Sequence, residues 1–153
     1  MSILRSYAAK TDQGPYLQIN EDGHLIDYAH GLFLVLDGFG GSGIGDKTTT
    51  LVKENLKKFY LKIGGDPNAT LPFFHSPKYL LEGNALINAM YYAHMEVIKH
   101  NTEKKISSRG GACGIGVALS KNMLTFSSAG NCMAYLFRQG ELNVLAKPDG
   151  RFS

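Results

Sequence analysis

An aspartate at the end of an apolar run is the residue whose position in this sequence most favours a catalytic or metal-binding role. Residues 32–36 (LFLVL) form a short apolar run without turn signals, which is typical of a buried strand. The run ends at Asp37, and glycine and serine dominate the stretch 38–45 that follows. Glycines permit positive φ angles and a close approach of the backbone to a ligand. A rigidly held carboxylate beside such a loop suits a hard cation or a phosphate.

Three kinds of site and one simpler alternative fit this stretch. Residues 38–43 match the dinucleotide pattern G-x-G-x-x-G, but that fingerprint needs an acidic residue about 20 positions later, where this sequence has lysines and Phe59. A phosphate loop needs lysine directly after Gly45, and Asp46 stands there instead. The third site is a metal centre on Asp37, and the simpler alternative is a glycine-rich turn between a strand and a helix. The stretch by itself does not separate these alternatives.

Two further acids, Glu21 and Asp22, precede a second expected strand at residues 24–28. On their own they also fit a plain turn. A turn at residues 29–31 would join this strand to the apolar run as a hairpin, which brings both acids to the same end as Asp37. Carboxylates held together repel one another unless a cation lies between them. Oxygen ligands favour Mg²⁺ or Mn²⁺ over Zn²⁺.

Two helices are expected to position this group. The first starts at about Asp46, and the second covers residues 78–101. Each carries apolar residues at helical spacing, which predicts one buried stripe per helix. The stripe residues are Val52, Leu56, Phe59 and Ile63 in the first helix, and Leu86, Met90, Ala93 and Val97 in the second.

Strands are expected on both sides of the helices in the sequence. A first strand is predicted at residues 3–9. Two-residue turns at 121–122 and 139–140 are of the kinds that form tight hairpins. Later strands are expected at 112–120, 123–128, 132–138 and 141–145. Strands and helices that are segregated along the chain predict the α+β class, with an antiparallel sheet and helices on one face.

Composition limits the class of protein. The 153 residues suffice for one domain with a real core, and 44% hydrophobic residues is ordinary for a globular protein. The net charge of +3 is too small to indicate a nucleic-acid partner, and no apolar run is long enough to predict a membrane span. Cys113 and Cys132 lie in apolar runs, so we expect buried thiols rather than a disulfide framework or a zinc site. We predict a single cytoplasmic domain over residues 1–153.

Six motifs of the chain form a familiar series. The early ones are Thr11-Asp12-Gln13-Gly14, Asn20-Glu21-Asp22 and Asp37-Gly38-Phe39-Gly40-Gly41, with Gly45-Asp46 after them. This series resembles the N-terminal part of the metal-dependent protein phosphatases of the PP2C (PPM) family. Two later stretches stand where that family has Gly-Thr-Thr and its Gly-Asp-Ser-Arg strand with the following hairpin: Gly110-Gly111-Ala112 and residues 129–142.

The resemblance implies a PP2C-like β-sandwich of antiparallel sheets, flanked by two long helices, with Mg²⁺ or Mn²⁺ as cofactor. Matched residue by residue, Asp37 would bridge two ions, while the Gly38 carbonyl and Glu21 would complete the shell of one of them. Asp22 would position a metal-bound water, so Asp22 and Asp37 are the implied catalytic residues. The implied reaction is hydrolysis of phosphoserine or phosphothreonine on a phosphoprotein substrate.

Departures from the family pattern support an alternative function. The family's phosphate-holding arginine corresponds to Leu17, which cannot bind phosphate in that way, so the substrate-binding residue is unknown. The acid of the family's Gly-Asp-Ser-Arg is Asn131, and the aspartates for a second ion belong to a later part of the family's domain. Asp149 fits a turn. The alternative is a catalytically impaired pseudophosphatase that acts as a binding or regulatory module.

The resemblance also predicts how the sheet is covered. Half of a β-sandwich leaves an apolar sheet face open, so we expect self-association or a further C-terminal segment.

A nucleotide-binding protein that uses the glycine-rich loop ranks third among the alternative functions.

Overall fold

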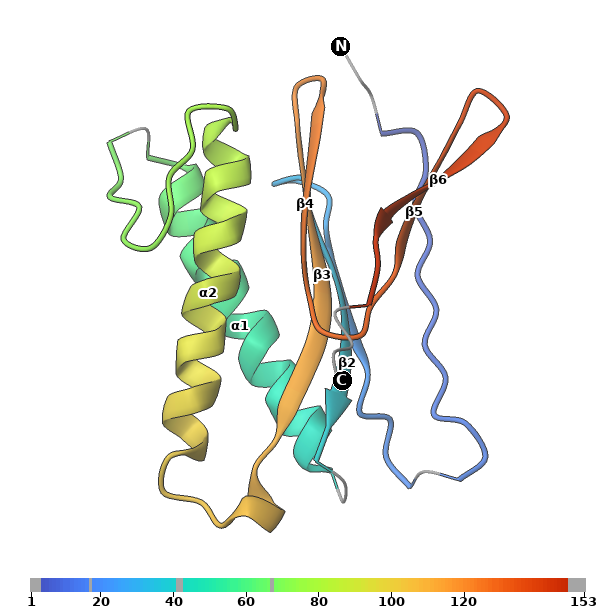
Figure 1. Cartoon of the computed structure of the whole chain (residues 1–153), viewed down its shortest axis with the longest axis vertical. Coiled ribbons are helices and arrows are strands. Elements are labelled where there is room, and N and C mark those ends of the chain that lie inside the picture. Colours follow the sequence, from blue (N-terminus) through green and yellow to red (C-terminus); the bar gives the residue numbers. More distant parts are fainter. Residues whose placement is uncertain (1–3, 17, 41–42, 67, 149–153) are drawn as a thin grey trace.

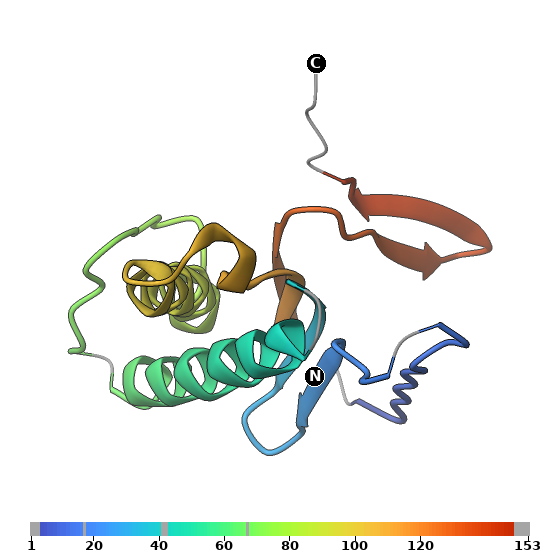
Figure 2. The same cartoon turned by 90° about the horizontal axis from the view of Figure 1, so that it is seen from below.

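The structure is a computed structural model that describes residues 4–16, 18–40, 43–66 and 68–148. Two long helices, a four-stranded sheet and a two-stranded hairpin follow one another as three layers (Figure 1). The end-on view places the helices on one face of the sheet and the hairpin, with the N-terminal segment, on the other (Figure 2). No helix within the described ranges is long and apolar enough to cross a bilayer. The α+β class predicted from the sequence is confirmed.

Four antiparallel strands form the central sheet. They are, in spatial order, β1 (Gly23–Asp27), β2 (Leu32–Phe39), β3 (Gly111–Ser120) and β4 (Met123–Ala129). In the register of the strands, Gly23 lies opposite Leu36, and Asp37 lies opposite Cys113. The start of β1, the end of β2 and the start of β3 therefore share one end of the sheet.

Both helices pack on the same face of this sheet. They are α1 (Ile44–Gly64) and α2 (Leu81–Asn101). Strand β2 turns Leu32, Leu34 and Leu36 toward them, and these side chains are almost fully buried. Burial of each such side chain contributes about 1.5–3 kcal/mol. The predicted stripes are confirmed by the core residues Leu56 and Ile63 of α1 and Leu86 and Ala93 of α2.

Helix α2 begins later than the predicted residue 78, because the chain before it is held in a non-helical conformation. The buried Asn88 accepts hydrogen bonds at Oδ1 from the N–H groups of Phe73 (2.9 Å) and Phe74 (3.2 Å). Asn84 accepts one from the N–H of Ser76 at 2.8 Å. These side-chain amides give hydrogen-bond partners to backbone N–H groups outside any helix or strand, which stabilises an irregular segment beside the helix.

The second sheet is a hairpin of β5 (Ala134–Arg138) and β6 (Glu141–Ala146). Its predicted two-residue turn is confirmed, with φ angles of 55° at Gln139 and 82° at Gly140. The two sheets agree with the predicted sandwich, but large apolar side chains remain exposed on both. They include Val35 and Phe39 of the first sheet and Phe137, Leu142 and Val144 of the second.

One predicted element is wrong. Residues 4–9 form no strand, and Ile3, where the predicted strand begins, lies outside the described residues. Side chains 5–9 are exposed, so this segment has no buried face that would favour pairing with the sheet. Alternation of apolar and polar residues therefore did not predict a strand correctly here, because the apolar positions gain too little cover to favour pairing with the sheet.

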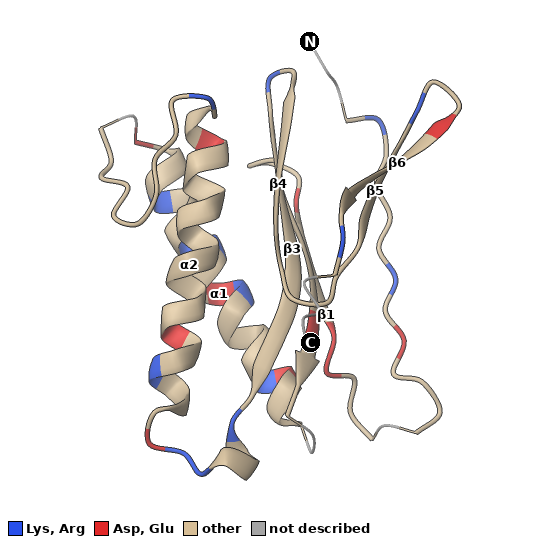
Figure 3. Cartoon of the chain, viewed as in Figure 1, with Lys and Arg blue, Asp and Glu red and all other residues tan. Residues whose placement is uncertain are grey.

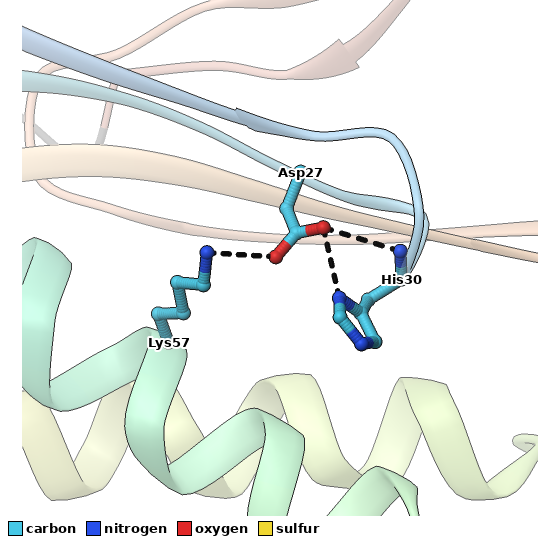
Figure 4. Close-up of polar contacts among 3 residues, drawn as sticks. All are labelled: Asp27, His30 and Lys57. Carbon is cyan, nitrogen blue, oxygen red and sulfur yellow. Dashed lines mark hydrogen bonds and ion pairs between the residues drawn. The ribbon is translucent and has the colours of Figure 1, made fainter.

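An ion cluster fastens the turn between β1 and β2 to helix α1 (Figure 4). Asp27, which is 8% exposed, pairs through Oδ2 with Lys57 Nζ of α1 at 2.9 Å. Its Oδ1 accepts the N–H of His30 at 3.2 Å and lies 2.9 Å from the ring Nδ1 of that residue. The pKa of Asp27 falls to about 2, chiefly through Lys57, with His30 adding to the effect against the opposing influence of burial. This carboxylate is therefore fully ionised at neutral pH and is matched by positive charge.

Candidate metal centre

Acidic residues gather at the end of the sheet where β1 begins and β2 ends (Figure 3). Glu21 and Asp22 directly precede β1, and Asp37 lies near the end of β2. Because Gly23 pairs with Leu36, continuation of the antiparallel register places Asp22 beside Asp37. Successive residues of an extended chain point to opposite sides, so Glu21 and Asp22 face in different directions.

The side chain of Glu21 turns toward the helix layer. It is 8% exposed, and its Oε1 accepts a hydrogen bond from the N–H of Gly43 at 2.9 Å. Gly43 is the N-cap residue of α1, with a φ of 77°. Gly45 follows in the first turn, where a Cβ atom would lie 2.6 Å from Glu21 Oε2. Free N–H groups at a helix start attract negative charge, so Glu21 acts here as a carboxylate cap for α1.

Asp22 and Asp37 form the exposed part of the group. The pKa of Asp22 is raised from its ordinary value of 3.8, first by partial burial and then by the charge of Asp37. A hydrogen bond with Asp37 and the charge of Glu21 raise it further. Within the described part of the chain, no lysine, arginine or histidine pairs with either Asp22 or Asp37. The two carboxyl groups therefore share a site in which their charge is not compensated.

The backbone that carries Asp22 is held by side chains of its own motif and of the motif before it. Asn20 accepts the N–H of Asp22 at Oδ1 (3.0 Å) and donates through Nδ2 to Thr11 Oγ1 (2.9 Å). Asp12 in turn accepts the N–H of Gly14 at 2.8 Å, which closes a turn. The Thr-Asp-Gln-Gly and Asn-Glu-Asp motifs thus form one connected support for the acidic pair.

Gly38 allows the strand, the acidic segment and the helix start to approach closely. A Cβ atom at this position would collide with the carbonyl oxygen of Glu21, and it would lie 2.7 Å from that of Gly45. Its register partner is Ala112 of β3. The structure thus places Gly38, predicted to offer a carbonyl ligand, directly between the backbones of Glu21 and α1.

Two later motifs border the same end of the sheet. Asn101, the last residue of α2, donates through Nδ2 to the carbonyl of Gly110 at 2.7 Å and accepts its N–H at 3.2 Å. Asn131, which stands where the resemblance implies an acid, follows β4 and is exposed.

Cys113 and Cys132 are partly exposed, so the prediction that both thiols are buried is wrong in degree.

The donors available at this end suit a hard cation. Within the described ranges, no set of three or more histidine, cysteine or acidic side chains is placed to hold an ion. Glu21 holds the helix start through Oε1. The donors at this end are therefore the carboxyl oxygens of Asp22 and Asp37, the second carboxyl oxygen of Glu21 and nearby backbone oxygens. Mg²⁺ is commonly bound by one or two carboxylates with waters that complete its shell, so this donor set fits one such ion.

Sequence reasoning identified the acids but missed what supports them. Asn20 and Thr11 were seen only as parts of motifs, although an amide two residues before an acid is a recognisable signal for a turn bond. The role of Gly43 as helix N-cap was also missed. Leu17 and Asp149 lie outside the described residues, so the predictions made for them stay predictions.

No protein-family model matches the sequence, and no curated protein matches it. Solved structures do match. The serine/threonine phosphatase PstP/Ppp of Mycobacterium tuberculosis shares 23% identity with a TM-score of 0.72, over 94% of this chain and 55% of its own. The PPM Ser-Thr phosphatase MsPP of Mycobacterium smegmatis, solved in complex with cacodylate, shares 22% with a TM-score of 0.70, over 95% and 54%. The catalytic domain of PstP in complex with two manganese ions shares 23% identity with a TM-score of 0.72, over 94% of this chain and 56% of its own.

These comparisons establish the fold. The chain spans about half the length of the phosphatases that it matches. The predicted resemblance is confirmed at this level, because all three neighbours are serine/threonine phosphatases and the match covers nearly all of this sequence. The protein has the fold of one part of a PP2C-type (PPM) serine/threonine phosphatase domain.

Proposed function

We propose that this chain carries the metal-binding part of a PP2C-type phosphatase, which hydrolyses phosphoserine and phosphothreonine on protein substrates with Mg²⁺ or Mn²⁺. The observation that carries the proposal is the uncompensated Asp22–Asp37 pair at the end of the sheet. Its support comes from the shared fold, since the catalytic domain of one neighbour was solved with two manganese ions.

Three residues would hold the ion. Asp37 offers a carboxylate on a strand whose alternate side chains are buried, which fixes its position. Gly38 offers a backbone carbonyl, and Glu21 would contribute directly or through a water. An ion bound there would polarise phosphoryl oxygens and increase the acidity of a bound water. The buried contact between Glu21 and Gly43 holds this segment rigid before any ligand arrives.

Asp22 would act on the water that attacks the phosphate ester. Its exposed carboxylate lies beside Asp37 in the strand register, so a carboxyl oxygen can accept a hydrogen bond or a proton from that water. The bonds that connect Asn20 with the Asp22 backbone and with Thr11 restrict how far the acid can move. A positioned base of this kind typically contributes about 10²–10⁴-fold to a rate.

The alternative is a pseudophosphatase that keeps the fold as a binding or regulatory module. Two observations favour it. The described residues hold no group of three ligand side chains, and Asn131 stands where the resemblance implies an acid. An amide in place of that acid removes one negative charge from the site, which lowers its attraction for a further cation.

Phosphate release from a phosphothreonine peptide separates these proposals. The full native chain is incubated with Mn²⁺ and compared with its Asp37→Ala variant and with Glu54→Gln, a control that removes an exposed acid from the middle of α1. We expect release to fall by at least about 100-fold in Asp37→Ala and to be unchanged in Glu54→Gln. Equal release by the native chain and Asp37→Ala would refute the phosphatase proposal. Absence of both release and Mn²⁺ binding would favour the pseudophosphatase.

A further inference from the structure

The two cysteines of the chain lie close to each other at the acidic end of the sheet. Cys113 is in β3, directly opposite Asp37 of β2, so both side chains stand on the same face of the sheet. That face is the one away from the helices, because the neighbouring Leu36 and Gly114 are buried on the helix side. Cys113 therefore belongs to the partly open face that also carries the acidic pair.

The connection from β4 to β5 brings Cys132 to the same place. Ala129, the last residue of β4, pairs with Gly114, so Gly130 comes next to Cys113. Gly130 has a φ of 82°, and a Cβ atom there would lie 2.5 Å from Cys113 Sγ. The sulfur of Cys113 thus rests against the backbone of Gly130, in the space that a larger residue would fill.

A tight turn then keeps Cys132 near this contact. The N–H of Cys132 donates to the carbonyl of Gly130 at 3.0 Å. The Cα atoms of Gly130 and Cys132 are at most about 7 Å apart, and the turn shortens this distance. A disulfide needs Cα atoms about 4.4–6.8 Å apart, so the β4–β5 connection must carry Cys132 to within that distance of Cys113. The pKa of Cys132 is raised by burial, then by Cys113 and Asp37, in agreement with this closeness.

We propose that Cys113 and Cys132 are an oxidation site that a hydroperoxide converts into an intramolecular disulfide. In the first step, one thiol takes an oxygen from the peroxide and becomes a sulfenic acid, and the peroxide leaves as water or alcohol. In the second step, the other thiol attacks that sulfur, an S–S bond forms, and water leaves. The two thiols lose two electrons in total, which the peroxide accepts.

The simpler reading is that both cysteines are small apolar side chains with no chemistry. Partial exposure lets reagents reach both thiols. Because the raised pKa of Cys132 reduces its thiolate fraction, the closeness of the two thiols is what favours the disulfide. The bond would fasten the β4–β5 connection to β3 beside Asp37. It would thereby restrict the position of the hairpin relative to the first sheet.

Peptide mass mapping after peroxide treatment tests the proposal without reference to catalysis. The full native chain, Cys113→Ser and Cys132→Ser are treated with hydrogen peroxide at about pH 8, where thiols ionise more readily. Circular dichroism verifies that each variant is folded. We expect a reducible, intramolecular link between the peptides of Cys113 and Cys132 in the native chain. In each single variant, the remaining thiol should instead be captured by a reagent for sulfenic acid.

A control in denaturant shows whether the fold brings the thiols together. We expect the link to form at least tenfold faster in the folded chain than in urea. Separate oxidation of the two thiols in the folded native chain would overturn the proposal, and so would links between molecules only, or a link that forms equally fast in urea. Because the readout is the disulfide itself, failure of the phosphatase proposal would leave this result unaffected.

Discussion

The two ends of the β1–β2 hairpin shift the pKa values of their carboxylates in opposite directions. At the turn end, Asp27 is buried and paired with Lys57 and His30, and its pKa falls to about 2. At the open end, Asp22 and Asp37 are exposed and face each other, and the pKa of Asp22 rises. The same residue type thus has its charged form stabilised at one end and destabilised at the other.

The difference supports the proposal that the turn end is structural and that the open end binds a cation. A carboxylate matched by cations of its own chain needs nothing more, and it holds a turn against a helix. Two carboxylates kept together by strand register repel each other, and this cost persists in the folded state unless a cation from solution reduces it. The fold tolerates the repulsion because rigid backbone packing, rather than the acids themselves, holds this end together.

The largest effect on stability is expected from that backbone packing. Gly38→Ala places a methyl group against the carbonyl oxygens of Glu21 and Gly45 and the side chain of Thr49. Backbone atoms cannot move aside without disturbing the strand and the helix start, so we expect the free energy of unfolding to fall by about 3 kcal/mol. Urea titration monitored by circular dichroism measures this free energy of unfolding.

Gly140→Ala is the matched control for this substitution. Gly140 has a φ of 82° and open space where its Cβ would stand. The alanine meets backbone strain alone, for which about 1 kcal/mol is expected. Equal losses in Gly38→Ala and Gly140→Ala would show that close packing does not hold the acidic end.

The next effect concerns the paired carboxylate. Asp27→Asn removes the charge that pairs with Lys57, while an amide oxygen remains to accept from His30. After allowance for the exposure of Lys57 and His30, we expect a loss of about 1–2 kcal/mol at pH 7. Thermal or urea unfolding at several pH values provides the measurement.

The pH dependence of that loss has a definite sign. The folded-state pKa of Asp27 is depressed, from 3.8 to about 2. Its contribution is therefore fully present above the unfolded value and is lost as pH falls from about 4 to about 2. Native protein should lose its advantage over Asp27→Asn across that range. An advantage that stays constant with pH would contradict the ion cluster.

The smallest effect is expected at the acidic pair in metal-free protein. The folded-state pKa of Asp22 is raised, so its ionisation destabilises the fold as pH rises through that value. Asp22→Asn removes the repulsion and should leave stability at pH 7 unchanged or higher by less than about 0.5 kcal/mol, because the site is exposed. A clear loss of stability in chelator-treated Asp22→Asn would show that Asp22 is a structural residue like Asp27.

Most strands, both helices and the acidic end of the sheet could be predicted from local patterns in the sequence. Both helices carry apolar residues at helical spacing, and two-residue turns fix the hairpins. Glu21, Asp22 and Asp37 could be brought together because pairing two strands around a short turn leaves little freedom. The sequence pattern did not indicate that Glu21 faces the helix, since this depends on where α1 starts and on the room that Gly45 leaves.

Other features depend on contacts distant in sequence. The late start of α2 follows from side-chain amides of Asn84 and Asn88 that reach back to the preceding segment. The ion pair between Asp27 and Lys57 joins a strand to a helix, and the lysine fits a plain solvated helix face equally well. Closeness of the two cysteines needs the registers of β2, β3 and β4 together.

Mn²⁺ titration of three matched proteins tests the central claim most directly. The three proteins are the native chain and the variants Asp37→Asn and Asp27→Asn, each of which lacks one carboxylate. Calorimetry measures the affinity of each protein for Mn²⁺. We expect Asp27→Asn to bind Mn²⁺ as the native chain does, and Asp37→Asn to bind at least about 100-fold more weakly, a difference of about 2.7 kcal/mol. Equal affinities in all three proteins, or no binding by the native chain at millimolar Mn²⁺, would contradict the assignment of the Asp22–Asp37 pair as a cation site.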